Sequence, residues 1–294
     1  MKKLTFIILS CMLFAGISKA QSGMENVTIT SEQLAPNIYV LFGSGGNIGL
    51  AVGENYAYMI DDQFGQLSEK ILAAVRKITD KPLKYVVNTH WHGDHTGGNE
   101  NMAKKGAILV ANDAVRKRMS MPRNGETAST TPYLALPEIT FTDEMTIHLD
   151  PNNTMMIFHM ESAHTDGDSF IYFPEKNVIH LGDNFPNGGY PFIDINSNGD
   201  IEGLITNLNR ALFLVNDQTK IIPGHGKVSD RATLKSYRDM IDTVRERVKS
   251  AKSSGKSLEE VQKMGLSKEW DEEFGKGFIN SERFIESVYK TVDT

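Results

Sequence analysis

The sequence predicts a mixed α/β (α+β) protein in which helices flank two β-sheets. Of its 294 residues, 40% are hydrophobic and 23% are charged, a balance typical of a globular chain with a sizeable core. Short strand-like runs alternate with amphipathic helix-like runs over most of the chain. The net charge of −6 at pH 7 argues against a nucleic-acid partner, which would require a basic surface.

The first twenty residues have the layout of a secretory signal peptide. Lys2 and Lys3 precede an apolar run over residues 4–17, and the small residue Ala20 ends the segment. This run is short for a membrane span, and no other stretch approaches the needed length. The single cysteine, Cys11, excludes internal disulfides and leaves a lipid anchor open as an alternative to cleavage. We expect an exported protein, periplasmic or secreted after cleavage near Ala20, without stable membrane insertion.

The first half of the chain after this segment contains short antiparallel strands and then a strand–helix–strand unit. Apolar and polar residues alternate between glycines over Ile38–Phe42, Asn47–Val52 and Tyr56–Ile60. A helix is expected next, because apolar residues recur on one helical face between Leu67 and Ile78. Pro82 then precedes a predicted buried strand over Leu83–Val87.

The second half repeats this alternation. A helix is expected over Leu204–Leu214, and the expected strand regions are Ile108–Val110, Ile139–Leu149, Met155–Met160, Ser169–Phe173, Val178–Leu181 and Lys220–Ile222. Two mixed sheets with helices outside them satisfy this order of elements.

A helical extension over residues 229–294 follows the main domain, residues 21–228. Ser229 is the predicted N-cap of its first helix, whose apolar residues recur at helical spacing, and Ser257 with Glu260 forms a capping box for a second helix. Balanced charge argues against a membrane-surface helix. We expect these helices to pack on the main domain and border its pocket, because four residues supply aromatic mass: Phe274, Phe278, Phe284 and Tyr289.

A dense cluster of metal-ligand residue types directly follows the strand Leu83–Val87. Its sequence is His90-Trp91-His92-Gly93-Asp94-His95. Alternate residues of an extended segment project the same way, so His90 and His92 face one point, and Asp94 and His95 beyond the turn face a second. One loop thus serves two metal ions.

Each ion needs about four to five donors, so further ligands must come from elsewhere. Three candidates, His164, Asp183 and His225, each lie just past a predicted strand end in a glycine-containing loop. Ligands that are all nitrogen and oxygen suit two zinc ions per chain best, and iron or manganese at one site stays open.

These residues resemble the metallo-β-lactamase superfamily over nearly all of residues 30–228. The resemblance implies a four-layer αβ/βα sandwich with the metals at one edge between the sheets. It implies a first metal on His90, His92 and His164, and a second on Asp94, His95 and His225, with Asp183 bridging both. Asp61 matches the acidic residue behind the metals, where a carboxylate can orient a ligand imidazole.

Other candidate residues have structural roles as the simpler explanation. His148, His159 and His180 lack a partner at metal spacing, so we interpret them as strand-face or surface histidines. The segment Asp194–Gly199 resembles the start of a calcium loop, but Ile205 stands where a bidentate Glu is required, which favours a turn. The aromatic residues near the site are predicted as pocket wall, with core packing as the alternative: Trp91, Phe64, Phe185 and Tyr190.

The site chemistry predicts a hydrolase acting on a small molecule. Two metal ions acidify a shared water, which supplies hydroxide at neutral pH, and one ion can polarise the carbonyl under attack. Asp94 is placed to receive or return a proton as the leaving group departs. The resemblance implies that Asp183 bridges the two ions. The chain has neither a Gly-x-Ser-x-Gly elbow nor a Gly-x-x-x-x-Gly-Lys loop, which disfavours acyl-enzyme and phosphate-cradle chemistry. The oligomeric state is not predicted.

The substrate prediction depends on one departure from a family pattern. In β-lactamases with a cysteine ligand at the position of Asp183, a lysine three residues later grips the substrate carboxylate, whereas Pro186 stands there in this chain. The aspartate and the full histidine set are similar to lactone- and thioester-cleaving branches. We therefore expect a lactonase acting on an N-acyl-homoserine lactone, as in quorum quenching, with a β-lactamase as the alternative. A non-catalytic metal-binding module would lack a ligand, and none is missing.

Overall fold

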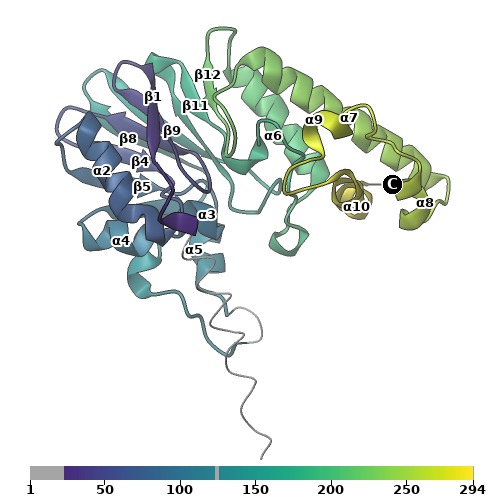
Figure 1. Ribbon diagram of the computed structural model, residues 1–294, viewed down its shortest axis with the longest axis horizontal. Helices are drawn as coiled ribbons and strands as arrows, with labels where there is room; N and C mark the ends of the chain where they lie inside the picture. Colours follow the sequence, from purple (N-terminus) through teal and green to yellow (C-terminus); the bar gives the residue numbers. More distant parts are fainter. Residues whose placement is uncertain (1–22, 123–125, 294) are drawn as a thin grey trace, which may run out of the picture.

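Two β-sheets pack face to face in the computed structural model, which describes residues 23–122 and 126–293, and helices cover both outer faces (Figure 1). This confirms the predicted four-layer sandwich. The expected signal peptide, with Cys11, lies outside the described residues. Among the residues that are described, none of the helices combines the length and the apolar character that a membrane span requires.

The first sheet combines an antiparallel and a parallel half. In the described part of the chain its seven strands run in the order β1 (Thr30–Ala35), β2 (Ile38–Phe42), β3 (Ile48–Val52), β4 (Ala57–Ile60), β5 (Leu83–Val87), β6 (Ile108–Asn112) and β7 (Ile139–Phe141). Neighbours from β1 to β4 are antiparallel, as the alternating pattern predicts, and neighbours from β4 to β7 are parallel.

The second sheet is mostly antiparallel. Within the same residues it contains five strands in the order β12 (Lys220–Ile222), β11 (Val178–His180), β10 (Ser169–Phe173), β9 (Asn153–His159) and β8 (Glu144–Asp150). Only β11 and β12 run parallel to each other among these pairs.

Helices occupy both sides of the two sheets (Figure 1). The first group is α2 (Ser68–Ile78), α3 (Gly93–Thr96), α4 (Asn99–Lys104) and α5 (Asp113–Met119). The second group is α6 (Ile201–Leu214), α7 (Arg231–Ser253), α8 (Leu258–Lys263), α9 (Asp271–Phe274) and α10 (Ser281–Thr291). The predicted helices near Leu67 and Leu204 correspond to α2 and α6.

Strand β4 shows why the core has layers. All four of its residues are buried, and alternate side chains of a strand point to opposite faces. Ala57 and Met59 pack with α2 in one apolar cluster, whereas Tyr58 and Ile60 pack with residues of the second sheet in another. A third cluster joins the outer face of the second sheet to α6, α7 and α10. Each space between layers therefore has its own apolar core.

The C-terminal helices begin at side-chain caps. Ser257 and Glu260 form the expected capping box of α8. The prediction of Ser229 as the cap of α7 is wrong, because Asp230 is the N-cap and its carboxylate accepts a hydrogen bond from Thr233 N at 2.8 Å. The Ser229 backbone instead pairs with Ile221, the middle residue of β12.

Candidate metal centre

The carboxyl ends of three strands supply the anchor points of the site. His90, Asp183 and His225 each come three residues after the last residue of β5, β11 and β12, respectively. The carboxyl ends of parallel strands lie at one edge of a sheet, where loop side chains can converge. The layered fold thus places residues from both sheets at one edge of the sandwich.

All seven predicted ligand residues converge there. Their potential ligand atoms fall into three groups within which every atom lies inside 4.8 Å of the others: His90, His92 and His164; His90, His95 and Asp183; and Asp94, His95 and His225. Asp183 also lies 3.7 Å from His164 Nε2 and 3.4 Å from His225 Nε2. The Asp183 carboxylate therefore lies between the group that contains His164 and the group that contains His225.

The spacing of the group formed by Asp94, His95 and His225 suits a tetrahedral cation. Zinc–nitrogen bonds of about 2.0–2.1 Å separate two ligand atoms of a tetrahedron by roughly 3.3 Å. His225 Nε2 lies 3.2 Å from Asp94 Oδ2 and 3.3 Å from His95 Nε2. Two buried atoms that face the site, His90 Nε2 and Asp183 Oδ1, have no hydrogen-bond partner among the described residues. The donor set therefore fits a pair of divalent cations.

Asp61 and Thr89 determine which nitrogen of two ligand imidazoles is free. Asp61 accepts hydrogen bonds from Thr89 N and Thr89 Oγ1, each at 2.7 Å, and its Oδ2 lies 2.7 Å from His95 Nδ1. Since Thr89 Oγ1 gives its only proton to Asp61, it accepts from His90 Nδ1 at 3.0 Å. Both rings therefore carry the proton on Nδ1, which leaves the Nε2 lone pairs for a metal.

The other two histidines of the first group are fixed in the same manner. His164 Nδ1 donates to the backbone oxygen of Phe192 at 2.6 Å, which leaves Nε2 free. His92 Nε2 donates to Asp194 Oδ2 at 3.0 Å, so its free nitrogen is Nδ1, and this atom lies 2.8 Å from His164 Nε2. Two lone pairs aimed at one point at this distance require a proton or a cation between them.

Asp194 is a site residue that sequence reasoning missed. The segment after it does form the predicted turn, a short 3-10 helix over Ile195–Ser197. The carboxylate additionally accepts from His92, which lies 102 positions earlier. The density of Asp and Asn in this segment was the available signal, and it was interpreted as turn chemistry alone.

The carboxylates and imidazoles of the site shift one another's pKa values. The Asp183 carboxylate raises the pKa of His225 to about 9, although burial opposes this. Burial would lower the pKa of His95, but Asp183 and Asp61 raise it well above its usual value. Burial would raise the pKa of Asp183, yet His225 and His95 hold it well below its usual value. Negative charge is therefore concentrated at the site, and metal binding there competes with protons.

Two glycines allow the backbone to approach the ligands closely. A Cβ added at Gly224 would lie 2.0 Å from Asp183 Oδ1, and one at Gly46 would lie 2.1 Å from His95 Cε1. Any side chain at either position would displace a ligand.

A cavity of about 790 Å³ opens over the ligands, with His92, Asp94, Asp183 and His225 in its wall. Phe64 and Tyr190 also line it, where pocket wall was predicted. Two aromatic residues predicted as pocket wall do not line it. Phe185 is 1% exposed and packs edge to face on Tyr237 of α7 in the core. Trp91 packs under the loop against the apolar cluster around Val115.

The remaining histidines join none of the ligand groups formed by the described residues. His148 is exposed on β8, and His159 at the end of β9 lies 3.1 Å from the backbone oxygen of Asp168. His180 is fully buried, and its Nε2 donates to the backbone oxygen of Asn47 at 3.1 Å. His180 therefore has a structural role beside the site.

The histidine-rich centre, its carboxylate between two ligand groups and the αβ/βα sandwich define a class of metal-dependent hydrolases. The sequence matches the Metallo-beta-lactamase superfamily over residues 41–246. The chain belongs to this superfamily, and its histidine-rich centre is that of a metallo-hydrolase.

Similar proteins differ in what their names say they hydrolyse. The chain is 25% identical over 240 residues to a type 2 metallo-beta-lactamase of Bacteroides fragilis, covering 76% of this chain and 90% of that protein. It is 26% identical over 184 residues to a hydroxyacylglutathione hydrolase of Pelagibacter ubique, covering 58% of this chain and 66% of that protein.

Solved structures share the fold. A stereoselective inverting sec-alkylsulfatase from Pseudomonas sp. superposes with a TM-score of 0.71 at 18% identity, over 89% of this chain and 50% of that one. The chain thus spans half the length of that enzyme. A metallo-beta-lactamase from Pontibacter korlensis superposes with a TM-score of 0.62 at 16% identity, over 73% of this chain and 99% of that one.

Proposed function

We propose that this protein is an exported, dinuclear zinc hydrolase that opens a cyclic ester, an N-acyl-homoserine lactone. The observation that carries the substrate class is the composition of the pocket wall. Among the described residues that line the cavity over the ligands, none is a lysine or an arginine, and several are aromatic or apolar. A neutral ring with an apolar acyl tail suits such a wall, because it brings no buried charge that lacks a partner.

Divalent cations held by the seven ligand residues would supply Lewis acidity, which lowers the pKa of water and polarises a carbonyl. The chain's own residues position the reactants and move the proton. Asp94 lines the cavity. Burial would raise the pKa of Asp94, but its hydrogen bond with His225 and its interaction with His95 hold this pKa below its usual value. Its carboxylate is therefore ionised at neutral pH, which is the form that can accept a proton.

The proposed reaction balances with water as the only co-reactant. The water oxygen bonds to the carbonyl carbon and the ring C–O bond breaks. Asp94 accepts the proton released by the water and delivers it to the departing alkoxide. The product is an open-chain hydroxy acid.

A β-lactamase is the second candidate, favoured by the similarity to the Bacteroides fragilis enzyme over three quarters of this chain. Pro186 lies in the pocket wall at the position where a lysine would bind the substrate carboxylate. The loss of one charge-assisted hydrogen bond costs about 1.5–3 kcal/mol, which weakens the interaction roughly 10- to 160-fold. This cost favours the lactone over the β-lactam.

The test compares initial rates of the purified, zinc-loaded protein on two substrate panels. One panel contains acyl-homoserine lactones, and the other contains nitrocefin and a carbapenem. We expect faster hydrolysis of the lactones, and chelator-treated protein is the blank. Rates on the β-lactams well above those on the lactones would overturn the lactone assignment in favour of the second candidate.

A further inference from the structure

The segment that joins α9 to α10 contributes an exposed aromatic ring to the pocket. Phe278 lies in this segment, 74% of its surface is exposed, and it lines the cavity together with the metal ligands. Its two neighbours in the chain, Gly277 and Ile279, also line the cavity. The C-terminal extension therefore supplies part of the pocket wall.

Phe192 connects this ring to the metal ligands. Its ring centroid lies 5.7 Å from that of His92 in a stacked arrangement, and 5.7 Å from that of Phe278 at an interplanar angle of 90°. Phe192 also packs edge to face on His164 at 5.7 Å. The aromatic surface is thus continuous from the first ligand group to the outer part of the cavity.

Arg283 on α10 holds Phe278 in place. Its guanidinium carbon lies 5.0 Å from the Phe278 ring centroid, and its Nη1 donates to the backbone oxygen of Phe278 at 3.1 Å. A cation over a ring and a bond to its backbone both favour one position of the segment. The ring is therefore held over the cavity with most of its surface in water, and a bound apolar group would remove that surface from water.

Building on the proposed function, we propose that Phe192 and Phe278 form a subsite for the unbranched alkyl tail of the substrate, through which the protein selects long tails over short ones. The reacting carbonyl lies at the metal ligands, and the tail extends along Phe192 to Phe278. The described wall of the cavity carries no lysine or arginine, so it offers no ion-pair partner to a negatively charged tail.

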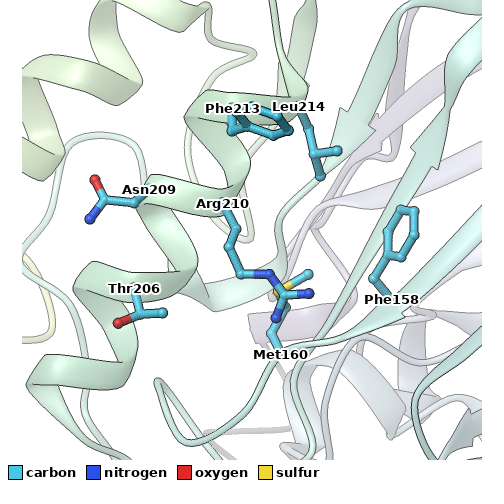
Figure 2. A pocket seen from close by; sticks show the side chains of 7 residues that line it. All are labelled: Phe158, Met160, Thr206, Asn209, Arg210, Phe213 and Leu214. Atoms are coloured by element: carbon cyan, nitrogen blue, oxygen red, sulfur yellow. The ribbon is translucent and has the colours of Figure 1, made fainter.

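Phe213 on α6 provides a matched control. It is 88% exposed and lines a different cavity of about 520 Å³, to which none of the seven ligand residues contributes (Figure 2). The wall of that cavity consists of Phe158, Met160, Thr206, Asn209, Arg210, Phe213 and Leu214. Truncation of Phe213 therefore removes an exposed phenyl ring without changing the proposed subsite.

The experiment measures the binding of unreactive probes, so that it does not depend on catalysis. Neutral N-alkyl acetamides from butyl to decyl are titrated calorimetrically into the zinc-loaded protein, its Phe278→Ala and Phe278→Leu variants, and Phe213→Ala. We expect each added methylene to tighten binding to the wild type about three- to fourfold, until the tail covers the wall. Phe278→Ala should weaken decyl binding about tenfold and leave butyl binding unchanged, and Phe278→Leu should restore part of the loss.

Each outcome separates the subsite from the proposed reaction. Equal chain-length dependence in the wild type and Phe278→Ala, or an equal loss in Phe213→Ala, would overturn the subsite even if lactones are hydrolysed. A dependence that requires Phe278 supports the subsite even if lactones are not hydrolysed, and in that case the lactonase assignment alone fails. Thermal unfolding of each variant checks that the fold is retained.

Discussion

One amide side chain fixes the loop that carries His225. Asn47 is 4% exposed, and its Nδ2 donates to the backbone oxygens of Pro223 at 2.9 Å and Gly226 at 2.8 Å, on either side of the ligand. Its backbone N–H donates to the oxygen of Gly224 at 2.7 Å. Three hydrogen bonds from one residue therefore determine where His225 points.

Replacing Asn47 with alanine should weaken the second metal position selectively. The change leaves two carbonyls of the loop without their donor, and loss of a residue that orients a ligand typically lowers metal affinity about 10- to 100-fold. Chelator competition would measure this as the early loss of one ion, while the ion on His90, His92 and His164 stays bound.

Asn101→Ala is the control for this change, because its amide bonds the Gly65 oxygen and Ser68 Oγ instead of the ligand loop. Unchanged affinity for both ions in Asn47→Ala would contradict the role of the amide.

The predictable and the missed residues of the site differ in the range of their contacts. The ligands within His90–His95 share one short loop, and the other three ligands, His164, Asp183 and His225, follow predicted strand ends. Patterns within short stretches of sequence therefore predicted all seven ligands. Asn47 acts on a loop more than 170 positions away, and Asp194 acts on His92 across 102 positions. Such contacts depend on how the two sheets pack, which single-sequence pattern does not contain.

The start of α7 shows a similar limit at the scale of one element. Ser229 and Asp230 are both good N-cap residue types, so the sequence left one residue of ambiguity. The Ser229 backbone pairs with that of Ile221, so Ser229 is held outside the helix and Asp230 becomes the N-cap of α7. Tertiary pairing, rather than propensity, decided the boundary.

Asp230→Ala should lower the free energy of unfolding by about 1 kcal/mol, the usual value of an N-cap. The hydrogen bond from Thr233 lowers the pKa of the Asp230 carboxyl. A lowered pKa means that this stabilisation is present above the ordinary carboxyl pKa and is lost as the pH falls through the lowered one. Urea unfolding at neutral and acidic pH measures both effects.

Ser229→Ala serves as the comparison. The Ser229 hydroxyl is buried without a hydrogen-bond partner among the described residues, so its removal should not destabilise the fold. A larger loss in Ser229→Ala than in Asp230→Ala would contradict the assigned cap.

At the scale of the whole molecule, the layers follow from strand and helix periodicity, and the site follows from the layers. Apolar runs with the right period predicted most strands and helices, and the order of elements predicted two sheets between helices. Side-chain direction at loops was less predictable, since Phe185 points into the core while Phe192, seven residues later, lines the pocket. The C-terminal helices complete the molecule by packing in the cluster outside the second sheet.

The central claim is that this edge of the sandwich binds a pair of divalent cations. Elemental analysis of the freshly purified protein tests it most directly, with Asp183→Ala measured alongside. We predict two transition-metal ions per chain in the wild type, and both a reduced metal content and lost turnover in the variant. A wild-type protein without any transition metal, or a variant that keeps full turnover, would contradict the account.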